Sequence, residues 1–480
     1  MEPCIPGVGW SGGELWRLFP EATEVVEPEE RLQGLTVDSR CPVAGGIFVA
    51  LQGKRVDAHT KLPEAFAGGV RLAIVDQAVW NHFPVDWRSY RCLPVVSPRK
   101  ALAELARVHR QRFQIPIIAV VGSAGKTTTK ELIAAVLAQR FRVLKTVGNE
   151  NNQLGVSLTL LQLRAEHEVA VLELGTNSFG EIARLCQIVQ PTHGVVTAIG
   201  EEHLEFLGTL AGVVQEETAL VRFLRHRGGK VFVPAEEPLL PAEDITFGLT
   251  PRADVWAAIS YDEAGYPILQ LHYGGELVEC RLRLVGEAAA RAAVAAAAVA
   301  WEMGLSAEEL REGLSTYRPS FPPDGAARML LVHLPNGVRF LNDTYNANPL
   351  SMRYALETLR RLPCPGRRWA VLGDMLELGA ATSAAHRMAL EQACAVADCV
   401  CLLGDTFASF APAFPNVRVC SSHREAAEYL WQWVQPGDLV LLKGSRKLQM
   451  ERILSLYRQR LDAKVEHHAV PFGGVDMEDL

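Results

Sequence analysis

The stretch Ala119-Val-Val-Gly-Ser-Ala-Gly-Lys-Thr-Thr-Thr-Lys130 decides the fold of this chain. An apolar run from Ile115 to Val121 ends at Gly122, a loop of small residues leads to Lys126 and Thr127, and a helix-like segment follows. Glycine lets backbone N–H groups approach an anion, the helix N-terminus adds partial positive charge, and the ammonium neutralises phosphates. A strand, a glycine loop, a Lys-Thr pair and a helix therefore predict a nucleotide phosphate site in an α/β domain.

The spacing of this loop departs from the usual phosphate-binding pattern. Gly122 and Gly125 are closer together than usual, and Val120 stands where the first glycine of the pattern is expected. The alternative is a plain glycine turn, but the strand before it and the apolar helix after it favour phosphate binding. We interpret the loop as an ATP site, with the Thr127 hydroxyl placed to ligate Mg²⁺. The loop residues of this site are Gly122, Ser123, Ala124, Gly125, Lys126, Thr127 and Thr128.

The composition is that of a large globular protein. The 480 residues suggest about two to four domains, and the 49% hydrophobic content is enough for their cores. The net charge of -7 argues against nucleic acid or an anionic membrane as a partner. The longest apolar candidate, Ala288 to Ala300, is interrupted by Arg291 and predicts a helix rather than a membrane span. No signal peptide is visible at the N-terminus.

The ten cysteines are scattered without a disulfide framework. Cys399 and Cys401 lie in an apolar run, which is typical of small buried thiols rather than of metal ligands. Cys4 has no evident role. We therefore expect a chain that works in a reducing cytoplasm.

Three α/β blocks follow one another along the chain, and we expect domains at residues 1–113, 114–320 and 321–464. The middle block alternates helices with near-continuous apolar strands, as in a mostly parallel sheet covered on both faces. The last block begins near a Pro-rich stretch, 319–325, and its strand-like runs end at glycines, which suggests a smaller doubly wound sheet. The tail, 465–480, is polar and lacks periodicity, so we expect it to be mobile.

Polar residues at strand ends are the candidates for a site, since ligands of open α/β sheets bind beyond the carboxyl ends of the strands. Glu173 ends an apolar strand and would hold a cation near the phosphates or cap a helix. His203 and Glu205 follow the next strand and suit either a metal or an ordinary packed position. The asparagine-rich segment 148–155 is either a polar turn or a ligand-reading loop.

Together these signals occur in the order of one family. The chain resembles the Mur ligases, and specifically their MurF type, over nearly its whole length. The most discriminating segment is Asn342-Asp-Thr-Tyr-Asn-Ala-Asn-Pro349. Further similar segments are Val371–Gly379 with His386, Leu442–Arg446 with Met450 and Glu451, and, as nucleotide-sugar elements, Val37–Arg40, Gly46–Leu51 and Asp57–His59.

The resemblance implies three domains: an N-terminal UDP-binding α/β domain, a central P-loop-like ATPase with a mostly parallel sheet, and a C-terminal Rossmann-like domain. It also implies an ATP-dependent amide ligase that needs Mg²⁺ and works as a monomer. Such a ligase joins D-alanyl-D-alanine to UDP-N-acetylmuramoyl-tripeptide through an acyl phosphate, for peptidoglycan precursor synthesis. The products would be the UDP-linked pentapeptide, ADP and phosphate.

The resemblance also implies roles for individual residues. Catalysis would depend on Lys126, Glu173, His203 and Glu217, and the metal would be held by Thr127, Glu173 and His203. Arg328 and Asp343 would complete the ATP site when the domains close. The substrate would be contacted by Ser39, Arg40, Asp57, His59, Asn149, Asn151, Asn152, Thr176, Asn177, Tyr345, Asn346 and Asn348.

Two positions depart from the family pattern. Many members carry a carbamylated lysine where this chain has Glu217, and we hypothesise that Glu217 supplies a permanent carboxylate there. The alternative is that Glu217 faces solvent on an acidic helix. The His and two Asn residues that normally help to read adenine are replaced by Ala288, Ala289 and Ala292.

Two other functions compete with the ligase. A folylpolyglutamate synthase or cyanophycin-type relative would have the same architecture but would lack the N-terminal UDP elements, so Ser39, Arg40 and His59 argue against it. A descendant that binds nucleotide sugar without turnover would explain the missing adenine-reading residues, but the retained Lys126 and Thr127 argue against it.

Overall fold

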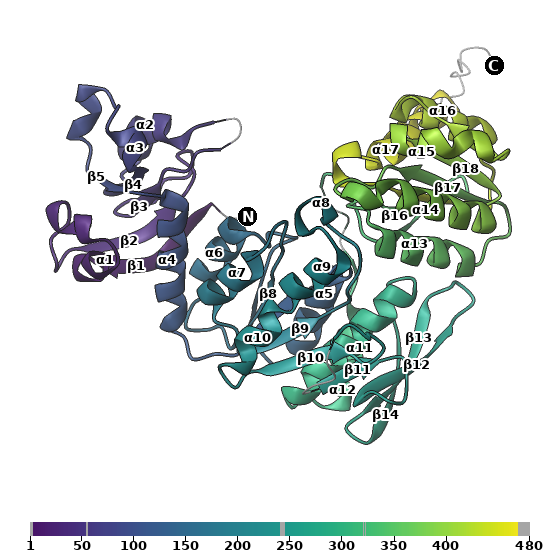
Figure 1. Ribbon diagram of the computed structural model, residues 1–480, viewed down its shortest axis with the longest axis horizontal. Coiled ribbons are helices and arrows are strands. Elements are labelled where there is room, and N and C mark those ends of the chain that lie inside the picture. Colours follow the sequence, from purple (N-terminus) through teal and green to yellow (C-terminus); the bar gives the residue numbers. More distant parts are fainter. Residues whose placement is uncertain (1–2, 54–55, 241–244, 320, 322, 469–480) are drawn as a thin grey trace, which may run out of the picture.

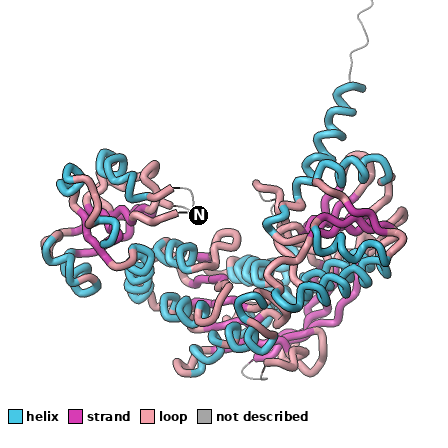
Figure 2. The backbone as a smooth tube through the Cα atoms, turned by 45° about the horizontal axis from the view of Figure 1, so that its top comes forward, coloured by secondary structure: helices cyan, strands magenta, loops and turns pink. Residues whose placement is uncertain are grey.

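The computed structural model of the chain describes residues 3–53, 56–240, 245–319, 321 and 323–468. It contains three β-sheets with helices packed around each, in N-terminal, central and C-terminal domains (Figures 1 and 2). This is the three-domain α/β architecture that the sequence predicts. In the described part of the chain, no helix is both long and apolar enough to cross a membrane.

The N-terminal sheet has five strands in the order β1-β2-β3-β4-β5. The first pair is antiparallel and the rest are parallel. Its elements are β1 (Cys4–Ser11), α1 (Gly12–Leu18), β2 (Arg31–Thr36), β3 (Ile47–Val49), α2 (Leu62–Ala67), β4 (Leu72–Asp76), α3 (Gln77–Trp80), β5 (Cys92–Val95) and α4 (Pro98–Gln111). Helix α4 ends this domain and packs on α6 and α7 of the central one, so it joins the two (Figure 1).

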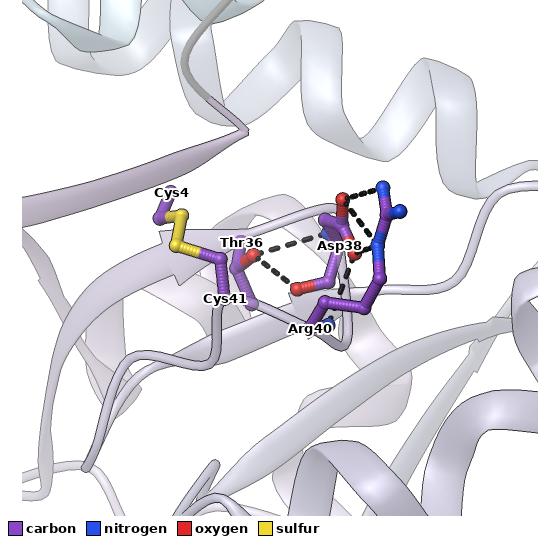
Figure 3. The surroundings of a disulfide bond; sticks show 5 residues. All are labelled: Cys4, Thr36, Asp38, Arg40 and Cys41. Carbon is purple, nitrogen blue, oxygen red and sulfur yellow. Dashed lines mark hydrogen bonds and ion pairs between the residues drawn. A yellow bond between two sulfur atoms is a disulfide. The ribbon is translucent and has the colours of Figure 1, made fainter.

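A disulfide links Cys4 of β1 to Cys41, which lies just after the segment Thr36–Arg40 (Figure 3). The scattered cysteines predict no disulfide framework, and the spacing of ten cysteines does not identify a pair. Asp38 in this segment binds the Arg40 guanidinium and accepts from the Arg40 N–H. The disulfide therefore ties the N-terminal strand to one of the expected nucleotide-sugar elements. Of the predicted buried thiols, Cys401 is buried and Cys399 is partly exposed.

The central sheet has nine strands in the order β14-β13-β12-β11-β10-β9-β6-β8-β7. Strands β6 to β12 pair in parallel, and β12, β13 and β14 form an antiparallel extension. The strands are β6 (Ile117–Val121), β7 (Val143–Lys145), β8 (Val169–Glu173), β9 (His193–Val196), β10 (Lys230–Pro234), β11 (Ile245–Gly248), β12 (Val255–Tyr261), β13 (Pro267–Tyr273) and β14 (Glu276–Arg281). The helices are α5 (Lys126–Leu137), α6 (Gln153–Leu161), α7 (Glu181–Val189), α8 (Leu204–Leu207), α9 (Leu210–Glu217), α10 (Ala219–Arg225), α11 (Glu287–Glu302) and α12 (Ala307–Thr316).

The apolar run at β6 is continuous because both of its faces are covered. Ile117 and Val121 point into the core that contains residues of α4, α6, α7 and α10. Ile118 and Val120 point into the opposite core, with residues of α5, α11 and α12. Side chains alternate across a strand, so a strand buried on both faces needs apolar residues at every position. This burial fixes the strand that leads into the phosphate loop.

The C-terminal sheet has six strands in the order β15-β16-β20-β17-β18-β19, parallel except for β15. Its elements are β15 (Leu330–His333), β16 (Arg339–Asp343), α13 (Pro349–Arg361), β17 (Arg368–Gly373), α14 (Thr382–Val396), β18 (Cys399–Leu403), α15 (Asp405–Phe410), β19 (Val417–Val419), α16 (His423–Trp433), β20 (Leu439–Lys443) and α17 (Glu451–His468). The predicted linker includes residues 320 and 322, which lie outside the described residues. Helix α17 includes positions 465–468 of the predicted tail, and 469–480 also lie outside the described part.

Candidate active site

A cavity of about 310 Å³ lies where the phosphate loop of the central domain meets the C-terminal domain. Its lining includes most of the residues that the sequence predicts for the ATP and substrate sites. From the central domain these are Ser123, Ala124, Gly125, Lys126, Thr128, Asn149, Asn151, Asn152, Glu173, Thr176, Asn177 and His203. From the C-terminal part they are Arg328, Asp343, Tyr345, Asn346 and Asn348.

The phosphate loop is held rigidly against the segment that follows β9. Gly122 has a φ of +125°, and a Cβ there would lie 2.4 Å from the Thr197 hydroxyl, so only glycine fits. The Ser123 N–H donates to the Ala198 carbonyl at 2.8 Å, and the Thr197 hydroxyl donates to the Ala124 carbonyl at 2.7 Å. The loop is thus preformed, with α5 starting directly behind Gly125.

Lys126 begins α5 and is surrounded by acidic groups. Its ammonium donates to the Gly122 carbonyl and lies 3.8 Å from Oε2 of Glu202. Burial alone would lower the pKa of Lys126, but the carboxylates of Glu202, Glu217 and Glu173 raise it. The lysine is therefore a permanent cation in the cavity.

Glu173 ends β8 as predicted and is fully buried. Its Oε2 accepts a hydrogen bond of 2.8 Å from the Thr127 hydroxyl, and its Oε1 accepts one of 2.8 Å from Nδ2 of Asn151. A carboxylate beside a hydroxyl at a phosphate loop is the donor set with which Mg²⁺ is bound in nucleotide sites, where phosphate oxygens and water complete the coordination.

His203 lies at the boundary between the two domains. It has a φ of +47°, its Nε2 is 4.0 Å from Oε2 of Glu202, and its Nδ1 is 2.7 Å from Oε2 of Glu377 in the C-terminal domain. Glu205, two residues further along the chain, does not line the cavity. Its N–H donates to the Glu377 carbonyl. Of the predicted pair, only His203 reaches the site.

Glu217 lies behind the phosphate loop, at the end of α9, and does not line the cavity. It is fully buried, so the alternative that it faces solvent is wrong. Its Oε2 accepts a hydrogen bond of 2.7 Å from the Gly122 N–H. Burial raises the pKa of Glu217 to about 8, against the lowering effect of Lys126. One loop amide is thus bound by a protein carboxyl rather than left free for a ligand.

The asparagine-rich segment forms one wall of the cavity, and a buried lysine holds it. Lys130 on α5 donates to the carbonyls of Thr146 and Gly148, at 2.7 Å each. Asn152 caps α6 through its side chain, and Asn149 donates to the Tyr345 hydroxyl of the other domain. The segment is therefore ordered before any substrate arrives.

The C-terminal domain supplies charges at the ends of its parallel strands. Asp343 at the end of β16 accepts a hydrogen bond of 2.6 Å from Nζ of Lys443, which ends the neighbouring strand β20. The Arg328 guanidinium lies 3.9 Å from the ring centre of Tyr345. Nδ2 of Asn348 donates to the Ser123 carbonyl at 3.0 Å, so the C-terminal domain touches the phosphate loop directly.

The four N-terminal residues of the predicted site lie apart from this cavity, in a turn after β2 and in a short 3-10 helix of the N-terminal domain. Ser39 and His59 are buried, and the Arg40 side chain is exposed and paired with Asp38. Nδ1 of His59 lies 2.6 Å from Oδ1 of Asp57, and its Nε2 accepts from the Asp76 N–H. His59 therefore links Asp57 to the end of β4.

Several residues of the site were not predicted from the sequence, and three of these lie beside predicted residues. Glu202 lines the cavity beside Lys126, Lys443 pairs with Asp343, and Glu377 binds His203. Glu202 is adjacent to the predicted His203, and Glu377 and Lys443 lie within the family-like segments Val371–Gly379 and Leu442–Arg446. The partners of the other two come from distant parts of the sequence.

The three alanines at the expected adenine-reading positions differ in location. Ala288 lines the cavity, but Ala289 and Ala292 are buried in the packing of α11. The described residues thus offer no amide or imidazole at positions 288, 289 and 292 with which to read a base.

A divalent cation fits this site only with ligands supplied by a nucleotide and water. In the ranges that the structure describes, no group of three or more His, Cys, Asp or Glu side chains is arranged to hold a metal. Among the described residues, Oε1 of Glu202 and Oε1 of Glu217 are buried and have no hydrogen-bond partner. With the Thr127–Glu173 pair, this oxygen-rich surrounding suits Mg²⁺, which keeps most of its water and phosphate ligands.

Two protein-family models match this chain, one over the central domain and one over the C-terminal domain. Residues 120–300 match the Mur ligase middle domain, and residues 327–446 match the family described as Mur ligase, glutamate ligase domain. The UDP-N-acetylmuramoyl-tripeptide–D-alanyl-D-alanine ligase of Treponema pallidum (strain Nichols) is 33% identical over 451 residues, 89% of this chain and 94% of that protein.

Two solved structures have the same fold. MurF from Acinetobacter baumannii superposes with a TM-score of 0.84 at 30% identity, covering 95% of this chain and 100% of that one. MurF ligase from Thermotoga maritima in complex with ADP superposes with a TM-score of 0.80 at 27% identity, covering 90% of this chain and 98% of that one.

Proposed function

The chain belongs to the Mur ligase family, in its MurF branch, and we propose that it joins D-alanyl-D-alanine to UDP-N-acetylmuramoyl-tripeptide at the expense of ATP. The observation that carries the proposal is the cavity in which Lys126, Glu173 and His203 of the central domain meet Asp343 and Arg328 of the C-terminal domain. The products are the UDP-linked pentapeptide, ADP and phosphate, in peptidoglycan precursor synthesis.

The first chemical step brings two anions together, the tripeptide carboxylate and the γ-phosphate. The carboxylate oxygen forms a bond to phosphorus while the bond from phosphorus to the ADP oxygen breaks, which gives an acyl phosphate. Lys126 and the amides of Ala124 and Gly125 would neutralise and orient the phosphates. Arg328 supplies a second positive charge from the facing domain.

Thr127, Glu173 and His203 would hold the magnesium ion, which neutralises phosphate charge when bound. The hydrogen bond between Thr127 and Glu173 holds both oxygens at one place beside Lys126. Asn151 binds the other oxygen of Glu173 and fixes the rotamer of that carboxylate. These residues are thus preorganised before nucleotide binds.

In the second step, the amine of D-alanyl-D-alanine attacks the acyl carbon, and the tetrahedral intermediate collapses to an amide as phosphate leaves. The acyl phosphate must be kept from water, and the domain contact between Asn348 and Ser123 closes the cavity beside it. The muramoyl-peptide would be contacted by Asn149, Asn151, Asn152, Thr176, Asn177, Tyr345 and Asn346 around this cavity.

The nucleotide-sugar end of the substrate would bind the N-terminal sheet. Arg40 is exposed and carries the charge suited to a diphosphate, and Ser39, Asp57 and His59 lie in the same domain. His59 would support this surface rather than contact the ligand, because it is buried. We also propose the domain bounds 1–113, 114–320 and 321–464. The monomeric state and cytoplasmic location stay predictions.

Glu217 would take the place of the carbamylated lysine as a titrating carboxyl group rather than as the expected permanent carboxylate, because burial raises its pKa to about 8. It binds the Gly122 amide and faces the Lys126 charge from behind the loop, so its contribution is to position these groups. Glu217→Gln keeps an acceptor for the amide but removes the carboxyl group whose pKa is about 8. If this variant leaves both the magnesium dependence and the rate unchanged, the role is wrong.

The experiment that tests the function is phosphate release with ATP, Mg²⁺, D-alanyl-D-alanine and UDP-muramoyl tripeptides that carry diaminopimelate or lysine. Each component is omitted in turn, and the pentapeptide is identified by mass. Release that requires both peptides supports the ligase and names its tripeptide. UDP-sugar binding without turnover would instead support a binding protein, the alternative that Ala288 favours because it removes a polar side chain from the cavity.

A further inference from the structure

Helix α9 ends in two consecutive buried glutamates, and they hold two different loops of the active-site cavity. Glu217 accepts a hydrogen bond from a backbone N–H of the phosphate loop. Glu216, which is 3% exposed, instead binds the loop between β8 and α7, residues 174–180. That loop carries Thr176 and Asn177, which line the cavity. One helix end therefore contacts both the loop proposed to bind ATP and a loop proposed to bind the muramoyl-peptide.

The Glu216 carboxylate completes the N-terminus of α7. This helix begins after Gly180, which has no side chain to accept the free N–H groups of the first turn. Oε2 of Glu216 accepts a hydrogen bond of 2.6 Å from the Gly180 N–H, and Oε1 accepts one of 2.7 Å from the Ile182 N–H. A carboxylate at this end of a helix also interacts favourably with the partial positive charge there. Glu216 is therefore a helix cap that is supplied by another helix.

The same carboxylate reaches the part of the loop that lines the cavity. The Thr176 hydroxyl lies 3.3 Å from Oε1 of Glu216 and 2.9 Å from the Ser178 carbonyl oxygen. Oε2 of Glu181, the first residue of α7, accepts hydrogen bonds of 2.5 Å from the Asn177 N–H and 3.2 Å from the Ser178 N–H. Two carboxylates, one from each helix, thus hold this loop in one conformation before a ligand binds.

Glu216 itself does not line the cavity, so it has no direct contact to offer a substrate. Within the described ranges, the hydrogen bonds of its carboxylate all go to this loop and to the first turn of α7. A loop that is ordered in advance adds no ordering cost when its ligand binds. Any effect of Glu216 on the reaction would therefore pass through Thr176 and Asn177.

We propose that Glu216 is a positioning residue for the muramoyl-peptide, because it fixes the loop that presents Thr176 and Asn177 to this substrate. Its neighbour Glu217 has the separate task of holding the phosphate loop. The inference rests on the proposed ligase function, and it adds a residue that acts on one of the substrates and not on ATP.

The test measures the KM values of Glu216→Ala and Glu216→Gln for the UDP-tripeptide and for ATP. Glu216→Ala should raise the KM for the UDP-tripeptide by about 10-fold or more, because the loop then has to be ordered on binding. The KM for ATP should stay within about twofold of wild type, whereas a general loosening of the domain would raise both values. Glu216→Gln retains one acceptor oxygen, so its KM for the UDP-tripeptide should lie between those of wild type and Glu216→Ala.

Glu166→Ala and Glu166→Gln are the matched controls, because Glu166 is exposed and does not line the cavity. Both should leave the two KM values unchanged. An unchanged KM for the UDP-tripeptide in Glu216→Ala, or an equal rise in both KM values, would overturn the inference and leave the ligase intact. The unfolding temperature of each variant verifies that it is folded, and Glu216→Gln carries the test if Glu216→Ala does not fold.

Calorimetric titration with the UDP-tripeptide separates this inference from the proposed function, because it needs no turnover. A wild type that binds the UDP-tripeptide but forms no pentapeptide would overturn the proposed function. The Kd of Glu216→Ala would still decide the role of Glu216, with the same rise of about 10-fold or more expected. A wild type that does not bind the UDP-tripeptide would overturn both.

Discussion

Nδ1 of His203 lies 2.7 Å from Oε2 of Glu377, and this pair joins the central domain to the C-terminal domain at the wall of the active-site cavity. Glu377 has a φ of +67° and also accepts the Glu205 N–H through its carbonyl, so its backbone and side chain both bind the loop around His203. The residue proposed to hold a metal is thus oriented by the opposite domain, as second partners commonly orient ligating histidines.

Replacing Glu377 with alanine should weaken the closed arrangement of the two domains. We expect kcat/KM to fall about 10-fold, roughly 1.4 kcal/mol, as for the loss of one charged hydrogen bond. Small-angle scattering should show a larger radius of gyration without substrates. Glu357→Ala, which removes a carboxylate paired within α13, serves as control and should change neither quantity.

Lys126→Met should abolish most of the turnover. Removing a preorganised positive charge from a phosphoryl-transfer site costs about a hundredfold to a thousandfold in kcat. It also leaves Glu202, Glu217 and Glu173 without their common counter-charge, so the unfolding temperature should fall as well. Single-turnover phosphate release and calorimetry measure the two effects. Activity within threefold of wild type would contradict the proposed role.

Glu217 makes stability depend on pH. Its pKa is about 8 in the folded chain, against 4.5 for an ordinary glutamate side chain, so the folded state binds the proton more tightly than the unfolded state. The contribution of Glu217 to the free energy of unfolding is fully present below pH 4.5. It is lost as the pH rises to about 8, by about 1.4 kcal/mol for each pH unit in this interval.

Glu217→Gln should therefore be less sensitive to alkaline conditions than the wild type. Urea unfolding of both proteins at about pH 5 and about pH 8 measures the difference. Between these two pH values, the free energy of unfolding of the wild type should fall by a few kcal/mol more than that of the variant, because only the wild type has the carboxyl group with the raised pKa. Equal losses in the two proteins would mean that Glu217 does not carry the effect.

Reduction of the Cys4–Cys41 disulfide should destabilise the N-terminal domain. The bond closes a loop with a sequence separation of 37, and loop-closure entropy for that length corresponds to about 4 kcal/mol. Unfolding in urea with and without reductant, for wild type and Cys4→Ser, checks this. Cys92→Ser, at a free buried cysteine, is the control and should respond to reductant as the wild type does.

The phosphate loop was predictable because its determinants are local. Strand β6, Gly122, Gly125 and the start of α5 are consecutive in the sequence, so apolar periodicity and glycine placement suffice to identify them. Glu173 was predictable for a related reason, since the carboxyl ends of parallel strands share one edge of a sheet.

Other parts of the site depend on contacts that no local pattern encodes. Asp343 and Lys443 meet because β16 and β20 are sheet neighbours, although 100 residues separate them in sequence. The burial of Glu217 depends on how α9 packs behind the loop, and an acidic helix segment alone is equally typical of a solvent-exposed surface. The Cys4–Cys41 pair was not predictable, because cysteine spacing does not determine connectivity.

Lys126 and Lys130 lie one helical turn apart on α5, and the second holds the carbonyls of Thr146 and Gly148 that precede the asparagine-rich wall. The phosphate loop and the asparagine-rich wall are thus anchored to a single helix. Whatever the other two domains do, these two parts of the cavity belong to the central domain and would move together.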